Sequence, residues 1–277
     1  MKDKFDYIVY GASIAGCLIA IQKANEDNEV LLINNFGFPG GSISESLNCL
    51  QQIESTNCDA LNYLVSEIEK DKFGFLYKKM NTVIVNPEII KYKLQTMLIN
   101  SSVTPLFHGK PFEIETLVNK KFLSVSLKEG IMKFKYDKLI DASDNYDLFT
   151  TLFPHESQNV STEINCVTTR LKESSLLDFK DIHNTVKLNN GRYWVSFKLG
   201  NDSTFKPNGQ NILDEFSATL LKSNNRIQLL PSTYFVRHNI IEDSNKSGII
   251  TKYHITKKQF KSDELLLEAD QILNSNY

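Results

Sequence analysis

The chain opens on a strand, a glycine turn, a helix and a second strand, and this order limits the fold more than any other feature. Phe5–Tyr10 is a short apolar run that ends at Gly11, and Glu29–Ile33 is a second apolar run. Between them, apolar residues from Ser13 to Asn25 recur at the spacing of one helix face. These segments form a βαβ unit, whose right-handed crossover makes the two strands parallel neighbours. The sequence therefore predicts an α/β fold with a doubly wound, Rossmann-like domain.

The glycine turn at residues 11–16 reads GASIAG, a GxSxxG variant of the dinucleotide-binding pattern GxGxxG. The first glycine permits a tight turn out of the strand, and the last lets the helix pack close to the sheet. Ser13 is small enough for backbone to approach a pyrophosphate, and the helix start offers N–H groups and a positive dipole end. The alternative is an ordinary strand–turn–helix without a ligand. The turn predicts phosphate contacts at Gly11, Ser13, Ile14, Ala15 and Gly16.

The end of the second strand is the place where such a unit carries an acid that hydrogen-bonds a ribose. Here that place holds Asn34, with Asn35 beside it. An amide bonds a hydroxyl more weakly than a carboxylate does. We predict that Asn34 takes the ribose position.

Two later segments have helical periodicity, Cys58–Lys70 and Asn86–Asn100. In the second, Asn86 suits the N-cap and Pro87 the first helical position. A strand is expected at Val103–Phe107.

The segment between Phe112 and Tyr136 contains three stretches in which apolar and polar residues alternate. This pattern predicts an antiparallel β-meander that serves as a crossover. Lys138–Asp141 then resembles a separate return to the parallel sheet. The pattern changes after Asp147, and we expect a dinucleotide-binding domain at residues 1–150.

Residues 151–277 are expected to form a mixed α+β, β-rich second lobe that partly returns to the first domain. Strand-like runs occur at Thr162–Leu171 and Arg192–Leu199. Helices are expected at Ile212–Lys222 and Ser262–Asn274. No internal repeat is visible in the sequence.

The composition limits which binding partners and which cellular compartment we expect for this protein. The 277 residues carry a formal net charge of −2, which gives no electrostatic reason to expect nucleic acid or an anionic membrane as a partner. The opening segment is too short and too interrupted for a signal peptide, and no run is long enough to span a membrane. The four cysteines are scattered, which fits a reducing compartment, and no cluster has metal-ligand spacing. We expect a cytoplasmic protein without a metal.

The run Val30–Asn48 resembles the family of FAD-dependent oxidoreductases in which the second strand is followed by an ERxGFLGGMAT-like segment. Leu94–His108 looks like the helix and strand that lead to that family's adenine-side contacts. Leu139–Leu148 is similar to its VIDATGDGDL segment. Tyr234–Ile255 looks like an altered form of a stretch that reads roughly FxRETRRI and then YxLT.

The resemblance implies that FAD is the cofactor and that the chain is an oxidoreductase whose redox chemistry is that of the flavin. It implies cofactor contacts at Gly40, Gly41 and Ser42 beside the ribose, and at Asp147 near the ribityl chain. Catalytic candidates within the last motif are Arg237 and His238, the second of which replaces a glutamate. The substrate and the electron-transfer partner stay open.

The sequence departs from the family pattern at several places. Asn34 replaces a glutamate, and Asp144 and Tyr146 replace two glycines of the GDG-type segment. Pro111 falls near a position whose N–H usually bonds the adenine ring, and proline has no N–H. Asp144 places a negative charge where close approach to the cofactor is expected. The sequence ends at Tyr277, whereas members of the resembling family continue with a segment that closes over the flavin ring. The protein is then naturally shortened, or the gene is a fragment, or the ring is covered in another way.

These departures leave an alternative: a non-catalytic relative that kept the scaffold and serves as a binding protein or partner subunit. A nucleotide-dependent enzyme that uses NAD is a third interpretation. Bound FAD in the purified protein would favour the interpretation as an FAD-dependent oxidoreductase.

Overall fold

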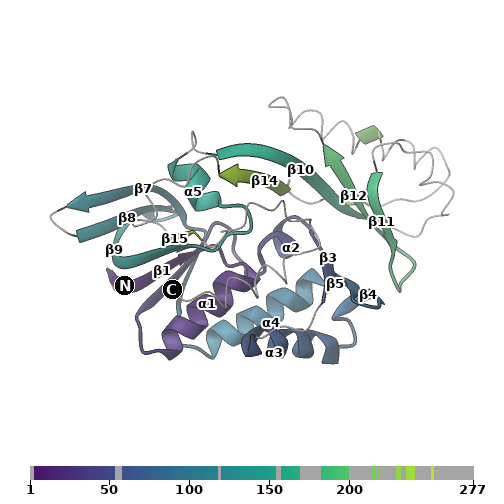
Figure 1. The fold of residues 1–277 in the computed structure, drawn as a ribbon, viewed down its shortest axis with the longest axis horizontal. Helices are drawn as coiled ribbons and strands as arrows, with labels where there is room; N and C mark the ends of the chain where they lie inside the picture. The colour runs from purple at the N-terminus through teal and green to yellow at the C-terminus, as the bar shows by residue number, and fades with distance from the viewer. Residues whose placement is uncertain are drawn as a thin grey trace.

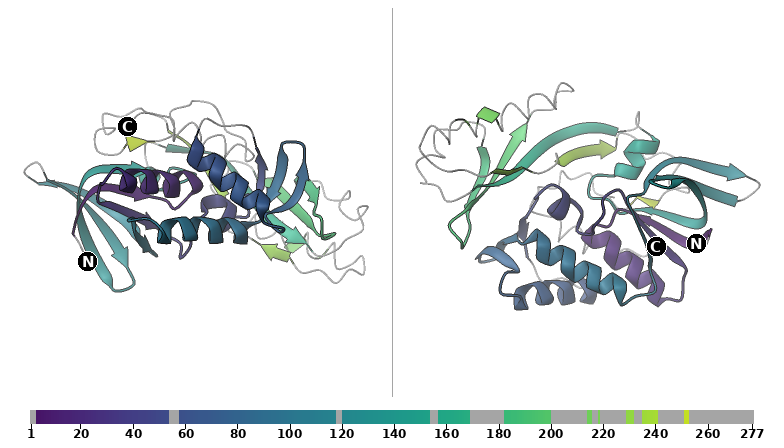
Figure 2. Two further views of the ribbon diagram at one scale, coloured as in Figure 1. Left: turned by 90° about the horizontal axis from the view of Figure 1, so that it is seen from below. Right: turned by 180° about the vertical axis from the view of Figure 1, so that it is seen from behind.

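The structure is a computed structural model that describes residues 3–53, 58–117, 120–153, 157–168, 182–199, 214–215, 218, 229–231, 235–240 and 251–252. Its elements form a main sheet with helices on one face and a second, curved sheet that arches over α2 (Gly41–Glu45) (Figure 1). Figure 2 shows the same arrangement from below and from behind.

The main sheet has the strand order β6-β2-β1-β9-β8-β7. Strands β1 (Lys4–Tyr10), β2 (Val30–Asn34) and β6 (Thr104–Phe107) are parallel neighbours, and β1 also pairs in parallel with β9 (Gly130–Asp141). The helix α1 (Ile14–Asn25) connects β1 to β2. The predicted α/β fold with a Rossmann-like βαβ unit is confirmed.

The meander is built from β7 (Lys110–Leu117), β8 (Lys120–Leu127) and β9, as the alternating pattern predicts. The expectation of a separate strand at Lys138–Asp141 is wrong. Residues from Gly130 to Tyr136 of β9 pair antiparallel with β8, and the same strand continues from Lys135 to Asp141 in parallel with β1. One long strand therefore joins the meander to the parallel sheet.

Helices α1, α3 (Asp59–Lys70) and α4 (Pro87–Ile99) cover one face of the main sheet (Figure 1). The start of α4 follows the sequence prediction, since the Asn86 side chain accepts a hydrogen bond of 3.1 Å from the Glu88 N–H. The apolar side chains of these three helices pack with Val9, Leu32 and Ile140 from the sheet.

The opposite face of the parallel strands β1, β2 and β6 packs against side chains of the meander strands and of α5 (Asp147–Leu152). Phe5 and Ile8 of β1 pack there with Leu123 and Phe134 of the meander strands, all of them buried. The parallel strands are therefore buried on both faces, which explains their nearly continuous apolar sequence.

A small three-stranded sheet, in the order β3-β5-β4, was not predicted. It contains β3 (Leu50–Gln52), β4 (Phe75–Lys79) and β5 (Thr82–Val85). In the β4–β5 turn Met80 has a φ of 53°. This left-handed conformation is usually marked in a sequence by Gly or Asn, so a methionine gives no signal of the turn.

The second sheet has the order β11-β12-β10-β13, with β14 also paired to β10. The predicted strands at Thr162–Leu171 and Arg192–Leu199 correspond to β10 and β12. The strands of this sheet are β10 (Ser157–Thr168), β11 (Ile182–Lys187), β12 (Tyr193–Leu199), β13 (Leu229–Pro231) and β14 (Phe235–Ile240).

Hydrogen bonds attach this sheet to the segment after α2. The Trp194 indole N–H donates to the carbonyl oxygen of Leu47 at 2.8 Å, and the Asn165 amide donates to that of Ser46 at 2.9 Å. Both side chains are buried, and Trp194 belongs to the core formed with the helices.

The chain also returns to the main sheet, where β15 (Thr251–Lys252) pairs in parallel with β9. Of the helix expected at Ile212–Lys222, the structure describes only Asp214, Glu215 and Ala218, which are helical. The helix expected at Ser262–Asn274 lies outside the described residues. No described helix has the length and apolar character needed to cross a membrane.

The close packing of α1 on β1 gives a test of the fold. A Cβ on Gly16 would overlap the carbonyl oxygen of Gly11. We expect Gly16→Ala to lower the free energy of unfolding by about 3 kcal/mol, because overpacking at this contact has no flexible neighbour to relieve it. Urea denaturation followed by circular dichroism measures this change.

Gly130→Ala is the control for the backbone cost of replacing a glycine. Gly130 has a φ of +128°, and a Cβ there would meet nothing within 4 Å. We expect it to cost only about 1 kcal/mol, from the left-handed backbone alone. Equal losses for the two variants would contradict the steric argument.

Candidate functional site

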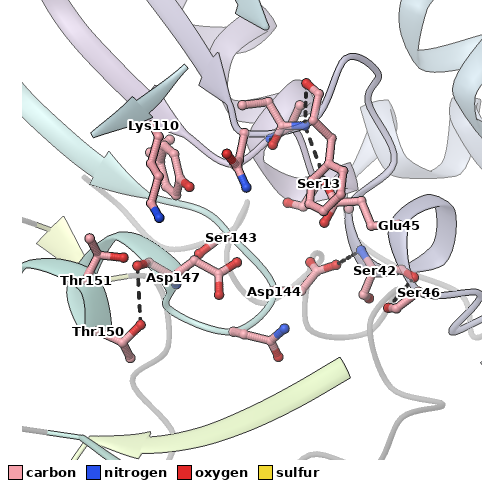
Figure 3. Close-up of a pocket in the computed structure, with 18 residues that line it drawn as sticks. Ser13, Ser42, Glu45, Ser46, Lys110, Ser143, Asp144, Asp147, Thr150 and Thr151 are labelled. Atoms are coloured by element: carbon pink, nitrogen blue, oxygen red, sulfur yellow. Dashed lines mark hydrogen bonds between the residues drawn. The ribbon is translucent and has the colours of Figure 1, made fainter. Parts of the chain in front are cut away.

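A pocket of about 310 Å³ lies at the carboxyl ends of β1, β2 and β9. Open parallel sheets bind ligands at this edge. Its wall is contributed by the glycine turn, the end of β2, α2, the start of β7 and the β9–α5 turn with α5 (Figure 3).

The glycine turn is held by hydrogen bonds within the protein. Ser13 is the N-cap of α1: its hydroxyl accepts from the Gly16 N–H at 3.0 Å and donates to the Ala142 carbonyl oxygen at 2.6 Å. One of the amides expected to be open to a phosphate is therefore capped by Ser13. The N–H groups of Ile14 and Ala15, the first two residues of α1, have no acceptor within their own helix.

Asn34 ties the end of β2 to this turn. Its side-chain oxygen accepts a 3.1 Å hydrogen bond from the Ala12 N–H, and its amide nitrogen donates to the Phe38 carbonyl oxygen at 2.9 Å. The side chain is 4% exposed. Asn34 lines the pocket, but its polar atoms act first on the protein's own backbone.

Asp144 occupies the space between the glycine turn and the Gly40–Gly41 pair. Its Oδ2 accepts a 2.6 Å hydrogen bond from the Ser42 N–H, and Figure 3 shows the carboxylate turned toward Ser42. A Cβ on Gly41 would overlap this oxygen and would lie 3.0 Å from Ser13 Cα. Ser13, Gly41 and Asp144 therefore meet at one point.

The β9–α5 turn that carries Asp144 is organised by Asp141. Its carboxylate accepts hydrogen bonds from the Ser143 hydroxyl at 2.5 Å and from the Phe149 N–H at 2.9 Å. Burial raises the pKa of Asp141 to about 6, and these hydrogen bonds oppose the rise. Tyr146, which replaces a glycine of the resembling segment, keeps a left-handed φ of 57°.

The pocket carries more negative than positive side chains. Burial first, and then the charge of Asp144, raises the pKa of Glu45 to about 8. Burial, followed by the charges of Asp141 and Asp144, raises the pKa of Asp147 to about 7. Lys110 is the only cationic side chain among the described lining residues.

The structure brings together most of the site residues predicted from the sequence. The predicted residues that line the pocket are Gly11, Ser13, Asn34, Gly41, Ser42 and Asp147. Ile14, Ala15, Gly16 and Gly40 adjoin these residues in the chain but are not part of the pocket wall. Whether any of them contacts a cofactor stays a prediction.

The two catalytic candidates lie on the second sheet. Arg237 and His238 belong to β14, where their backbones are registered with Ser161 and Asn159 of β10.

Sequence reasoning missed several lining residues, among them Tyr10, Glu45 and Lys110. Lys110 follows a predicted strand by only a few residues, so its place at the sheet edge was available as a signal. Glu45 had no such signal, because α2 is too short to show periodicity. Pro111 adjoins Lys110 and pairs with Val125 of β8.

The cysteines form no bond to one another, and burial raises the pKa of the Cys49 thiol, which makes it a poor nucleophile. Among the described residues, no cluster of His, Cys, Asp or Glu could hold a metal ion.

The raised pKa of Glu45 predicts a pH dependence of stability. The folded state keeps a proton up to about pH 8 that the unfolded chain releases near its ordinary value of 4.5. The folded state thus binds more protons in this window, so stability falls as pH rises through it. Glu45→Gln should weaken this fall, since the amide has no charge to bury. Thermal denaturation across the window measures both proteins.

An exposed carboxylate outside the pocket wall provides the control: Asp137→Asn, on β9, should leave the wild-type slope unchanged. The interpretation is wrong if Glu45→Gln has the same pH profile as the wild type.

The model of the family described as FAD dependent oxidoreductase matches residues 6–256. No curated protein matches the chain by sequence.

Solved structures share the fold at low identity. p-Nitrophenol 4-monooxygenase from Pseudomonas putida DLL-E4 has a TM-score of 0.63 at 11% identity, over 98% of this chain and 78% of its own. A flavoprotein/dehydrogenase from Cytophaga hutchinsonii has a TM-score of 0.60 at 12% identity, over 96% and 75%.

Aklavinone-11 hydroxylase, solved with FAD and aklavinone, has a TM-score of 0.57 at 9% identity, over 91% of this chain and 57% of its own. These likenesses establish the fold. The family model spans most of the chain, and the chain therefore belongs to the FAD-dependent oxidoreductase family, with FAD as its cofactor.

Proposed function

We propose that the pocket at the glycine turn is the place where this chain holds FAD for the oxidation or hydroxylation of a small organic molecule. The observation that carries the proposal is the convergence of the glycine turn, Gly41 and Asp147 on one pocket at the carboxyl ends of parallel strands.

The local backbone fits a dinucleotide. A Cβ at Gly11 would overlap the backbone of Ser143, and one at Gly16 would overlap Gly11 itself, so both glycines are needed for the close turn. The first N–H groups of α1, on Ile14 and Ala15, and the positive end of its dipole support a phosphate beside this turn. We propose that these groups face the diphosphate of FAD.

The remaining contacts follow from the pocket wall. We propose that Gly40, Gly41 and Ser42 lie beside the ribose and that Asp147 lies near the ribityl chain. Asn34 then serves mainly to hold the Ala12 N–H and the loop after β2 in place. When bound, FAD supplies the redox chemistry, and the protein supplies binding, orientation and exclusion of water.

The activity to test first is hydroxylation of a small aromatic molecule. Two structures with this fold are named a p-nitrophenol 4-monooxygenase and an aromatic hydroxylase from angucycline biosynthesis. Arg237 and His238 stay candidates for the substrate side of the reaction. We further propose a cytoplasmic location, from the free thiols, and neither nucleic acid nor membrane as a partner, from the charge of −2.

A non-catalytic relative is the second candidate, and a specific observation favours it. The Asp144 carboxylate accepts a hydrogen bond from the Ser42 N–H, in a pocket whose wall also contains Glu45 and Asp147. These acidic side chains oppose the binding of an anionic cofactor. Purified protein that neither contains nor takes up FAD would support this candidate over an oxidoreductase.

A matched pair at Ser13 tests the site. Asp and Asn have nearly the same size and both cap helices, so either should preserve the start of α1. Because the aspartate adds a charge beside the proposed phosphate position, we expect Ser13→Asp to bind FAD at least about tenfold more weakly than Ser13→Asn. Flavin absorbance retained after purification, and titration of FAD, give the comparison.

Equal FAD affinity in the two variants would place the diphosphate elsewhere. Circular dichroism of both variants verifies that the helix is intact.

Asn34→Asp restores the acid that the family carries at this place. The carboxylate cannot donate to the Phe38 carbonyl oxygen, so we expect a loss of about 2 kcal/mol in unfolding free energy and no gain in FAD affinity. Urea denaturation and FAD titration measure the two effects. Tighter FAD binding without loss of stability would show instead that residue 34 contacts the ribose directly.

A further inference from the structure

The Asp144 carboxylate lies beside the expected phosphate position. Its Oδ2 lies 2.6 Å from the Ser42 nitrogen. A Cβ on Gly41 would overlap this oxygen and would lie 3.0 Å from the Cα of Ser13, the N-cap of α1, so the carboxylate lies close to the start of that helix. Pyrophosphates in this fold lie at the start of that helix, next to the glycine turn. Asp144 therefore presents a carboxylate to backbone groups that suit an anion.

We propose that Asp144 is an internal anion that competes with the diphosphate of FAD, so that this residue sets how tightly the chain holds its cofactor. The proposal rests on the proposed function of the pocket. Asp144 must withdraw from the Ser42 N–H, or lose its charge, before a diphosphate can approach.

The surroundings of Asp144 oppose a second anion. Glu45 of α2 and Asp147 of α5 line the same pocket, and Lys110 of β7 is the described lining residue of opposite charge. Figure 3 shows Lys110 reaching into the pocket on the other side of the view from Ser42. A diphosphate added while all three carboxylates are charged is repelled at short range in a partly buried place.

The same arrangement couples cofactor binding to protons. The titratable groups that interact electrostatically with Asp144 are Cys17 of α1, Glu45 of α2 and Asp147 of α5. Tyr10 of β1 and Lys110 of β7 line the same pocket, and Asp141 of β9 acts on Asp147.

Of these groups, Glu45 and Asp147 change charge nearest neutrality, because burial and the Asp144 charge raise their pKa values to about 8 and about 7. As pH falls through this range, both carboxyls become neutral and the repulsion of a diphosphate weakens. FAD should therefore bind more tightly below pH 7 than above pH 8, with uptake of protons.

The test is isothermal titration calorimetry of FAD binding to the full chain freed of flavin, below pH 7 and above pH 8. Buffers of different ionisation enthalpy report how many protons are taken up on binding. Asp144→Asn keeps an oxygen that can accept from Ser42 without the charge, and Asp144→Gly removes the side chain. Above pH 8 we expect both variants to bind FAD at least about tenfold more tightly than the wild type, with a smaller pH dependence.

Asp137→Asn is the control for net charge, since it removes one charge from an exposed position of β9 that is not part of the pocket wall. It should change FAD affinity by less than roughly twofold, because water and salt screen an exposed charge.

The outcomes separate this proposal from the proposed function. If the wild type and the Asp144 variants bind FAD equally at both pH values, Asp144 does not compete, although the site still holds FAD. If none of them binds FAD at either pH, both proposals fail. If only the variants bind FAD, Asp144 is a complete block in the native chain.

Discussion

The contact between Gly16 of α1 and Gly11 at the end of β1 is the constraint on which the pocket depends. Neither position has room for a Cβ, so the helix starts as close to the sheet as backbone atoms allow. This approach directs the first N–H groups of α1 toward the carboxyl edge of the sheet. The end of β2 and the β9–α5 turn then complete the pocket, because both strands are registered on β1.

Side chains of the protein itself accept hydrogen bonds from the backbone N–H groups at this edge of the sheet. The Asn34 side chain accepts from the Ala12 N–H, and the Ser13 hydroxyl accepts from the Gly16 N–H. The Asp144 carboxylate accepts from the Ser42 N–H. We propose that FAD binding replaces these internal hydrogen bonds, with Asp144 as the most costly partner to displace.

Much of the fold could be predicted from local sequence. The β1–α1–β2 unit and the Asn86 cap of α4 depend on residues that are close in the chain, so periodicity and capping patterns locate them. The β4–β5 hairpin was missed because Met80 takes the left-handed turn position that Gly or Asn usually marks. The continuation of β9 was missed because one strand changes partners without a break in its sequence.

The site was only partly predictable. The glycine pattern predicted the turn, and the resemblance pointed to Gly41, Ser42 and Asp147, which line the pocket. The bond between Asp144 and Ser42 joins residues separated by 102 positions, and no local pattern indicates such a contact. The sequence could indicate that a charge at residue 144 is unusual, but the structure was needed to find the amide that it holds.

A structure of the chain crystallised with FAD tests the central claim most directly. The account predicts that the diphosphate lies beside the turn at residues 11–16 and that the Asp144 carboxylate has left the Ser42 N–H. FAD bound elsewhere, with the Asp144–Ser42 hydrogen bond of 2.6 Å intact, would contradict it.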